Sequence, residues 1–424
     1  MLLDEKNMDC SNQNIGTLNL NPIMTNDDPI YVGAHRTQFS AKEVNGEEVI
    51  RNGETFYKIS NADVMRPFFM SIVSNSNHWM FISSNGSLSA GRQNSNYALF
   101  PYYTDDKITE AAETTGSKTI FIVSKSGQKH LWEPFSVRQK GVYNTSSNLY
   151  KNSYGNKIVF EEINHDLELT FAYEWNASDK FGFVRKSCIT NNGTDRISIN
   201  LIDGIQNILP HGVEPALQNA SSNLVDAYKK CELEEDTGVG IYSLSAIIVD
   251  RAEPSEALKA NVVWSLGLDG AKKLISSLQL NDFRSGHDVL QEVDIRAEKG
   301  AYFLADEITL SGNAMQQWML VGNVNQTMSD IVKIKEKLEN RNALEDEVLT
   351  DIEEGSKHLV ELVGAADGLQ MTNDRLRNIR HFANTMFNIM RGGIFDDNYQ
   401  IEKEDFTNYI ANANRKVYRL KEAV

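Results

Sequence analysis

The sequence predicts a mainly β fold, an antiparallel β-sandwich followed by α-helices. From about Ile30 to Asn325, apolar residues recur with a period of two, in short runs separated by clusters of Asn, Gly, Asp and Ser. This pattern is typical of antiparallel strands. The runs are too numerous for one sheet of ordinary size, so two stacked sheets are expected. After Asn325 the apolar period lengthens to three or four residues, which predicts helices.

The central strand gives the strongest local signal in the chain. Its apolar residues Leu167, Leu169, Phe171, Tyr173 and Trp175 alternate with residues that are mostly polar, so one face can pack on a core. Further strand-like runs cover residues 119–124, 157–161, 181–185, 197–201, 240–249, 262–268, 302–310 and 317–321. Turn sequences such as Asn191-Asn192-Gly193 separate them. The sandwich is therefore expected to span residues 30–325, after a polar leader of residues 1–29.

Four helices are expected in residues 326–424. Thr327, followed three residues later by Asp330, is the pattern of a helix N-cap. The predicted apolar stripes are Ile331, Ile334 and Leu338; Leu344, Val348, Ile352 and Leu359; Leu376, Ile379, Ala383, Met386 and Met390; and Phe406, Ile410, Ala413, Val417 and Leu420. Gly392-Gly393 stands where the third helix would end.

Composition narrows the classes of partner. The chain has 424 residues, 41% hydrophobic and 24% charged, which is ordinary globular material. Its net charge of -16 repels phosphate backbones and anionic lipids, so neither nucleic acid nor a membrane is expected as a partner. The polar start has no signal-peptide pattern, and the three cysteines have no CxxC spacing, which favours a cytoplasmic protein with free thiols. No metal-binding histidine spacing or phosphate-binding glycine loop is present, and no cofactor is expected.

Several long segments resemble the N-terminal domain of cellobiose-phosphorylase-like proteins. They are NHWMFISSNG at 77–86, AGRQN at 90–94, FPYYTDDK at 100–107, LWEPF at 131–135, NHDL at 164–167, ILPHG at 208–212, SNLVDAYKK at 222–230 and NIMRGGIFD at 388–396. The resemblance covers nearly the whole chain from about Ile30 onward. It implies a β-supersandwich of the galactose-mutarotase type, a helical linker, an (α/α)6 barrel and a small C-terminal sheet, as in glycoside hydrolase family ninety-four.

Only the supersandwich and the linker are expected in this chain. In the family that it resembles, an aspartic acid on the barrel protonates the glycosidic oxygen while inorganic phosphate attacks the anomeric carbon. That acid has no counterpart here, so the resemblance implies a truncated or partial chain without catalytic residues of its own. Whether the chain alone is an enzyme stays open. The implied partners are an oligosaccharide or a sugar phosphate, the missing barrel and a second copy in a homodimer.

The residues from Arg92 to Asp106 are the ones that the resemblance places near a dimer interface and the partner's active site. Trp79, Arg92, Tyr102, Tyr103 and Asp105 are also the residue types of a sugar site, in which aromatic rings lie under the sugar and charged groups bind its hydroxyls. A structural role is the alternative. In that case the two rings of Trp79 and Tyr102 would lie in the core, and Arg92 would pair with Asp105 or Asp106.

Two further functions remain open. An aldose 1-epimerase needs a histidine acid and a glutamate base, for which His165 or His211 could act with Glu133 or Glu161. His211 is also a candidate sugar contact, because it stands beside a turn. Glu161 and Glu162 are adjacent in a strand and point to opposite faces, so they cannot attack one bond together. The second hypothesis is that the chain is a carbohydrate-binding module that acts alone.

Overall fold

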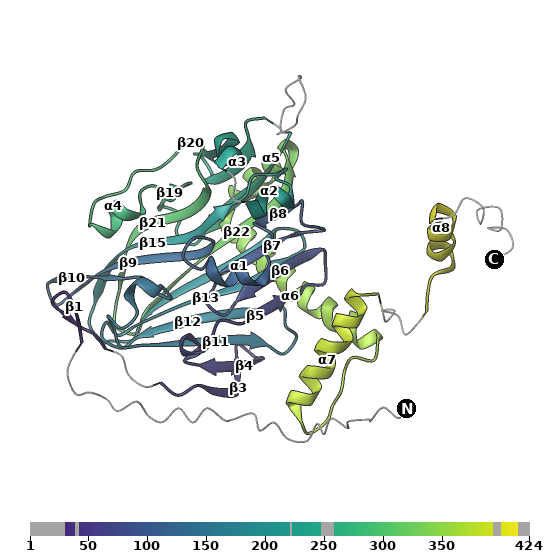
Figure 1. Cartoon of the computed structure of the whole chain (residues 1–424), viewed down its shortest axis with the longest axis horizontal. Coiled ribbons are helices and arrows are strands. Elements are labelled where there is room, and N and C mark those ends of the chain that lie inside the picture. Colours follow the sequence, from purple (N-terminus) through teal and green to yellow (C-terminus); the bar gives the residue numbers. More distant parts are fainter. Residues whose placement is uncertain (1–29, 39–41, 221–222, 247–257, 393–399, 414–424) are drawn as a thin grey trace, which may run out of the picture.

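The computed structural model describes residues 30–38, 42–220, 223–246, 258–392 and 400–413, and it confirms the mainly β fold (Figure 1). The largest sheet has eleven strands. In spatial order they are β20 (Asp294–Arg296), β16 (Lys229–Glu234), β17 (Val239–Leu244), β18 (Lys259–Leu266), β22 (Met315–Thr327), β14 (Gly182–Asn191), β13 (Leu169–Ser178), β12 (Ile158–Asn164), β11 (Thr145–Asn152), β4 (Glu54–Ser60) and β3 (Asn45–Arg51). Neighbouring strands in it pair antiparallel.

The described residues also form three smaller sheets. Five strands form one of them, in the order β10 (Gln128–Trp132), β9 (Gly116–Lys125), β15 (Ile197–Ile208), β21 (Gly300–Leu310) and β19 (Lys272–Leu274). Four strands form the next, β5 (Phe69–Ile72), β6 (His78–Ser83), β7 (Leu88–Arg92) and β8 (Ala98–Phe100). The last is the pair β1 (Tyr31–Val32) and β2 (His35–Arg36). Short helices lie between strands: η1 (Ala62–Val64), α1 (Asp105–Glu110), η2 (Val137–Gln139), α2 (Pro215–Ala220), α3 (Asn223–Tyr228) and α4 (Leu280–Arg284).

The main core lies between the eleven-stranded sheet and the two sheets that cover it. On β13, alternate residues are buried, as predicted, although the strand begins at Leu169 and Leu167 lies in the turn before it. The Phe171 ring meets the Phe121 ring of β9 edge to face at 5.2 Å between centroids. Further along the same face, Trp175 meets Phe100 of β8 at 6.1 Å. One side of a single strand thus packs on both smaller sheets, which is the expected sandwich.

A buried ion pair crosses this core. Arg185 of β14 and Asp203 of β15 are both fully buried, and Nη1 lies 2.7 Å from Oδ2. Asp203 also accepts hydrogen bonds from the Trp318 indole at 2.6 Å and from the hydroxyls of Thr119 at 2.5 Å and Ser187 at 3.1 Å. Five donated hydrogen bonds therefore balance the charge of this one carboxylate inside the sandwich.

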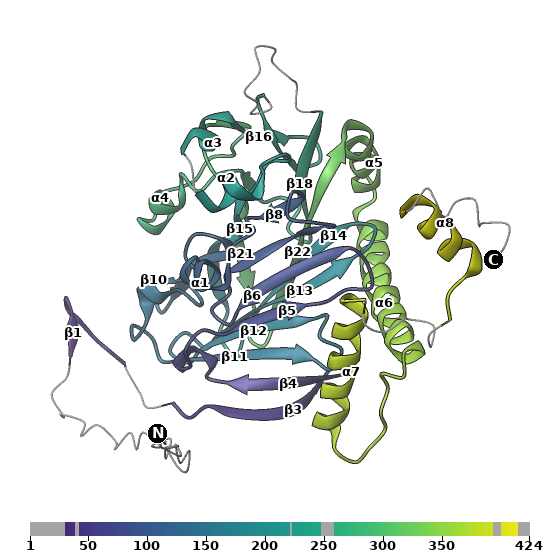
Figure 2. The ribbon, with the colours of Figure 1, turned by 45° about the vertical axis from the view of Figure 1, so that its right-hand side comes forward.

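Helices cover the other face of the eleven-stranded sheet (Figure 2). They are α5 (Met328–Leu338) and α6 (Arg341–Ala365), and their apolar residues pack with strand residues such as Val184 and Trp264. The predicted cap is confirmed, since Thr327 and Asp330 form a capping box at the start of α5. The boundary between sandwich and linker stays a prediction, although the last strand runs on to Thr327.

The last two helices are only partly packed. In α7 (Arg375–Met390), Phe382 and Met386 are buried beside α6, whereas Leu376 and Met390 of the predicted stripe are exposed. The next helix, α8 (Lys403–Ala413), stands away from the sheets in both ribbon views. The rest of the expected last helix, with Val417 and Leu420, lies outside the described residues. No described helix is long and apolar enough to cross a bilayer.

Candidate functional site

The predicted aromatic residues lie on the outer face of the four-stranded sheet. Trp79 and Phe81 alternate on β6 with the buried Met80 and Ile82, so both rings are half-buried and turn away from the core. Trp79 meets the Tyr102 ring edge to face at 5.4 Å, and Tyr102 is 39% exposed. The alternative that placed these two rings in the core is therefore wrong, because the period-two pattern of β6 directs Trp79 outward.

Arg92 has a structural role at the end of β7. Its guanidinium donates to Asn77 at 2.7 Å and pairs with Asp179 at 3.2 Å. The described ion-pair partner of Arg92 is thus Asp179, whereas the side chains of the predicted partners, Asp105 and Asp106, lie outside the part that the structure describes. Asp179 lies in the turn between β13 and β14, 87 residues away in the sequence, and only the stacking of the two sheets brings it to Arg92. Burial lowers the pKa of Arg92, and the charge of Asp179 opposes this shift.

The remaining predicted residues do not converge on one point. Tyr103 follows β8, and its backbone N–H donates to Ser89. Asp105 begins α1, and its side chain lies outside the part that the structure describes. The His211 ring stacks on Tyr97 with centroids 5.8 Å apart, and burial lowers its pKa. The structure thus joins Trp79 to Tyr102, whereas the described neighbours of Arg92, Tyr103 and His211 differ from one another.

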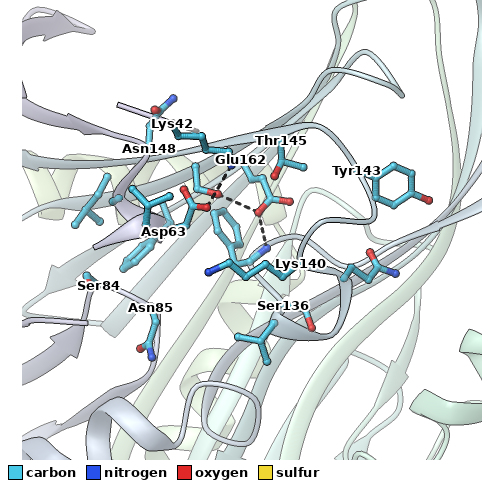
Figure 3. A pocket seen from close by; sticks show the side chains of 18 of the residues that line it. Lys42, Asp63, Ser84, Asn85, Ser136, Lys140, Tyr143, Thr145, Asn148 and Glu162 are labelled. Atoms are coloured by element: carbon cyan, nitrogen blue, oxygen red, sulfur yellow. Dashed lines mark hydrogen bonds and ion pairs between the residues drawn. The ribbon is translucent and has the colours of Figure 1, made fainter. Parts of the chain in front are cut away.

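The sequence did not predict a cavity that has a volume of about 330 Å³. It lies between β11, β12, the η1 turn and the loop of residues 133–143 (Figure 3). Its polar side chains include Lys42, Asp63, Ser84, Asn85, Ser136, Lys140, Tyr143, Thr145, Asn148 and Glu162. Its apolar lining includes Met65, Trp132, Phe135, Val137, Leu149 and Phe160. Such a mixture of apolar surface and convergent polar groups is typical of small-molecule sites.

Strand pairing explains how the floor of the cavity forms. Ser147 of β11 stands opposite Glu162 of β12, and Leu149 stands opposite Phe160. Residues opposite each other in an antiparallel pair share a face, and so do residues two apart in one strand. One polar pair and one apolar pair therefore line the same face, while Glu161 points to the other face.

Glu162 is a buried carboxyl group at this floor. Its Oε1 accepts the Trp132 indole N–H at 2.9 Å, and its Oε2 accepts the Phe135 backbone N–H at 2.9 Å and the Ser147 hydroxyl at 3.2 Å. Burial raises the pKa of Glu162 above its ordinary value; the three hydrogen bonds oppose this, and the charge of Asp63 adds to it. The carboxyl group is thus held in place by neutral donors.

Phe135 forms an aromatic wall in an uncommon backbone conformation. Its φ is 62°, in the left-handed region that a bulky side chain rarely adopts. The hydrogen bond from its N–H to Glu162 holds it there, and its ring meets the Phe160 ring edge to face at 6.2 Å. Strained residues of this kind cluster at functional sites. At the mouth of the cavity, Lys42 pairs with Asp63 at 3.3 Å, and Lys140 is exposed.

The geometry gives no support to the predicted epimerase pairs. Glu133 binds Arg284 at 2.7 Å and Lys118 at 2.8 Å; burial alone would raise its pKa, but these cations lower it below its ordinary value. The Glu161 carboxylate accepts from the Tyr150 hydroxyl at 2.7 Å on the far face of β12. His165 contacts the Ser146 hydroxyl at 2.9 Å. Within the part of the chain that the structure describes, no histidine lines the cavity and no cluster of three metal-binding side chains occurs.

Comparison with known proteins relates the chain to carbohydrate-active enzymes. The family model described as glycoside hydrolase family 149 insertion domain 1 matches residues 395–424, a segment that includes α8. This match agrees with the resemblance to cellobiose-phosphorylase-like proteins. No curated protein matches the chain.

Several solved structures are similar to the chain. A bacterial glucoamylase complexed with acarbose is 11% identical, with a TM-score of 0.41, over 83% of this chain and 43% of its own. A putative kojibiose phosphorylase from the human microbiome is 12% identical, with a TM-score of 0.33, over 77% of this chain and 37% of its own. A galactose mutarotase-like protein from Lactobacillus casei is 12% identical, with a TM-score of 0.31, over 61% of this chain and 100% of its own. The chain thus spans less than half the length of the glucoamylase and the phosphorylase.

Proposed function

We propose that this chain is the non-catalytic, carbohydrate-binding portion of a glycoside phosphorylase or related glycosidase, and that the cavity floored by Glu162 holds one unit of an oligosaccharide. The resemblance of its segments to cellobiose-phosphorylase-like proteins and the match at residues 395–424 support the enzyme class. The chemistry of the cavity supports the ligand class.

The observation that carries the proposal is the pairing of a fixed aromatic wall with a fixed carboxyl group. A sugar ring has apolar C–H faces and a rim of hydroxyls, so it needs a flat apolar surface next to oriented polar groups. Phe135 supplies the surface and Glu162 the polar group, and a 2.9 Å hydrogen bond fixes one relative to the other. Because the Phe135 ring and the Glu162 carboxyl group are held in place before a ligand binds, the entropic cost of association is lower.

The outer aromatic surface is the second candidate, because Trp79 and Tyr102 remain accessible there. A third ring, Phe69, is 42% exposed and stacks on Phe81 at 5.3 Å, so the apolar surface continues along the sheet. No polar pocket adjoins these rings among the described cavities. We assign this surface to contact with protein, either the (α/α)6 barrel or a second copy of the chain, and the sugar to the cavity.

Calorimetric titration of the purified chain with a panel of gluco-oligosaccharides of different linkage tests this assignment. The Phe135→Ala variant should lose binding at least about tenfold, because it removes the aromatic wall. The Tyr102→Ala variant should bind as the parent chain does. The reverse pattern would move the sugar to the outer surface, and no binding to any oligosaccharide would refute the carbohydrate-binding role.

A turnover assay tests the non-catalytic part of the proposal. The chain should release neither reducing sugar nor sugar phosphate from disaccharides, with or without inorganic phosphate. Activity that appears only after a separately expressed barrel domain is added would support a role in active-site closure. Turnover by the chain alone would overturn this part, and Glu162→Gln would then show whether the cavity is the catalytic site.

A further inference from the structure

We propose that the cavity accepts uncharged sugar units and excludes sugar phosphates and uronic acids, and that Glu162 is the residue that sets this preference. The inference rests on the proposed function, because it concerns the same cavity. It decides between the two ligands that the chain's resemblance leaves open, a neutral oligosaccharide and a sugar phosphate.

Among the residues that the structure describes, no cationic group donates to the Glu162 carboxylate. All three groups that donate to it, the Trp132 indole, the Phe135 amide and the Ser147 hydroxyl, are neutral. The residue is 7% exposed, so water screens its charge poorly. The nearby carboxylate of Asp63 has the same sign, but Lys42 pairs with it, so the repulsion comes from Glu162 itself. A second anion brought into the cavity would therefore meet repulsion that the protein does not offset.

The lysines at the mouth do not reverse this preference. Lys42 is already paired with Asp63 at 3.3 Å, so that pair has no net charge. Lys140 is exposed to solvent, and water and salt screen its charge beyond about 10 Å. Its attraction for an anion is consequently weaker than the repulsion from a buried carboxylate at the floor. A phosphate or carboxylate group could be drawn toward the opening but would not be stable inside.

A neutral sugar meets the opposite situation. Oε2 of Glu162 already accepts two protein donors, whereas Oε1 accepts only the Trp132 indole and has a second acceptor site that a sugar hydroxyl can use. Hydrogen bonds to a charged acceptor are stronger than those between neutral groups. The same carboxylate thus attracts hydroxyls and repels anions, which is how one residue can set the preference.

The experiment compares matched ligands at pH 8, well above the ordinary pKa of a glutamate, which favours the charged form of the Glu162 carboxyl group. The probes are methyl β-glucoside, methyl β-glucuronoside and glucose 1-phosphate, each titrated against the parent chain as competitors of the best-bound oligosaccharide of the panel. The neutral glucoside should compete at least about tenfold better than either anion, which is the discrimination expected from one unscreened like-charge contact.

Two variants on one strand make the test specific. Glu162→Gln removes the charge with little change of shape, and the preference for the neutral probe should fall below about threefold. Glu161→Gln removes the same charge from the opposite face of β12, and the preference should persist. The second variant shows whether a change of net charge alone is responsible.

The outcomes separate the two proposals. Equal or better competition by the anions, or a preference that Glu162→Gln leaves intact, would overturn this inference while the carbohydrate-binding role stands. No competition and no oligosaccharide binding would refute the proposed function, and the inference would be refuted with it. Folding of each variant is checked by its cooperative urea transition, since Glu162 also anchors the Phe135 loop.

Discussion

Removal of the charge of Asp203 should destabilise the sandwich more than any conservative surface substitution. Asp203→Asn leaves the Arg185 guanidinium fully buried without its counterion. The new amide group also presents an N–H group toward the donors of Trp318, Thr119 and Ser187. Loss of one partner of a buried ion pair costs about 3–5 kcal/mol. A whole domain is stable by only about 5–15 kcal/mol, so this variant should lose a large share of the free energy of unfolding.

Urea unfolding followed by tryptophan fluorescence measures this loss. Asp179→Asn is the matched control, because Asp179 is 57% exposed and its pair with Arg92 should contribute less than about 1 kcal/mol. The double variant Arg185→Met with Asp203→Asn removes both charges and should recover part of the stability. A loss below about 1 kcal/mol for Asp203→Asn would contradict the reasoning, because it would mean that water or a neighbouring group compensates the buried guanidinium.

Three further substitutions test the packing and the charges of the fold. Gly91→Ala places a Cβ 2.4 Å from the Trp79 ring and should cost about 1–3 kcal/mol in urea unfolding, whereas Gly270→Ala meets no atom within 4 Å and should be neutral. Leu344→Ala, in the buried α6 contact, should cost about 2–5 kcal/mol by the same measurement. Burial lowers the pKa of His78 from 6.5 to about 3, so its contribution to stability is present above pH 6.5 and is lost as the pH falls. Stability should drop by about 2 kcal/mol between pH 6.5 and 5, and a His78→Gln variant that keeps this drop would contradict the assignment.

The strands were predictable because their signal is local. Trp175 and Phe171 are two steps of one period-two pattern, and the pattern itself tells which face is buried. The helix start at Thr327 was equally local, since a capping box needs only residues three apart. The pattern could not predict which sheet packs on each face of a strand, because that depends on which strands become neighbours. The division between a five-stranded and a four-stranded cover on one large sheet therefore appears only in the structure.

The pairing of Arg92 with Asp179 was unpredictable for the same reason. The sequence offered Asp105 and Asp106 as near neighbours, and a pairing within one loop is the simplest expectation. The observed partner, Asp179, belongs to a hairpin turn of another sheet. A salt bridge is decided by the side chains that stacking brings within about 4 Å, and separation along the chain does not predict it.

The cavity escaped prediction for a different reason. The sequence correctly excludes Glu161 and Glu162 as a catalytic pair, because adjacent strand residues face opposite ways, and it offers Glu161 alone as a candidate epimerase base. Glu161 lies on the face of β12 with Tyr150, and Glu162 points toward the cavity beside Phe135. A signal was present in the segment LWEPF, since Trp132 and Phe135 are the two residues whose N–H groups hold Glu162.

The strain at Phe135 connects this segment to function. A left-handed backbone at a phenylalanine costs of order 1–3 kcal/mol, and a fold keeps it only where surrounding contacts enforce it. Here the enforcing contact is the buried Glu162, whose own burial is unfavourable while it is charged. A glycine at 135 with an apolar residue at 162 would remove both costs, so stability alone does not explain the pair. Orientation of an aromatic ring and a carboxyl group toward one cavity is what the present arrangement gains, and that is the requirement of a sugar site.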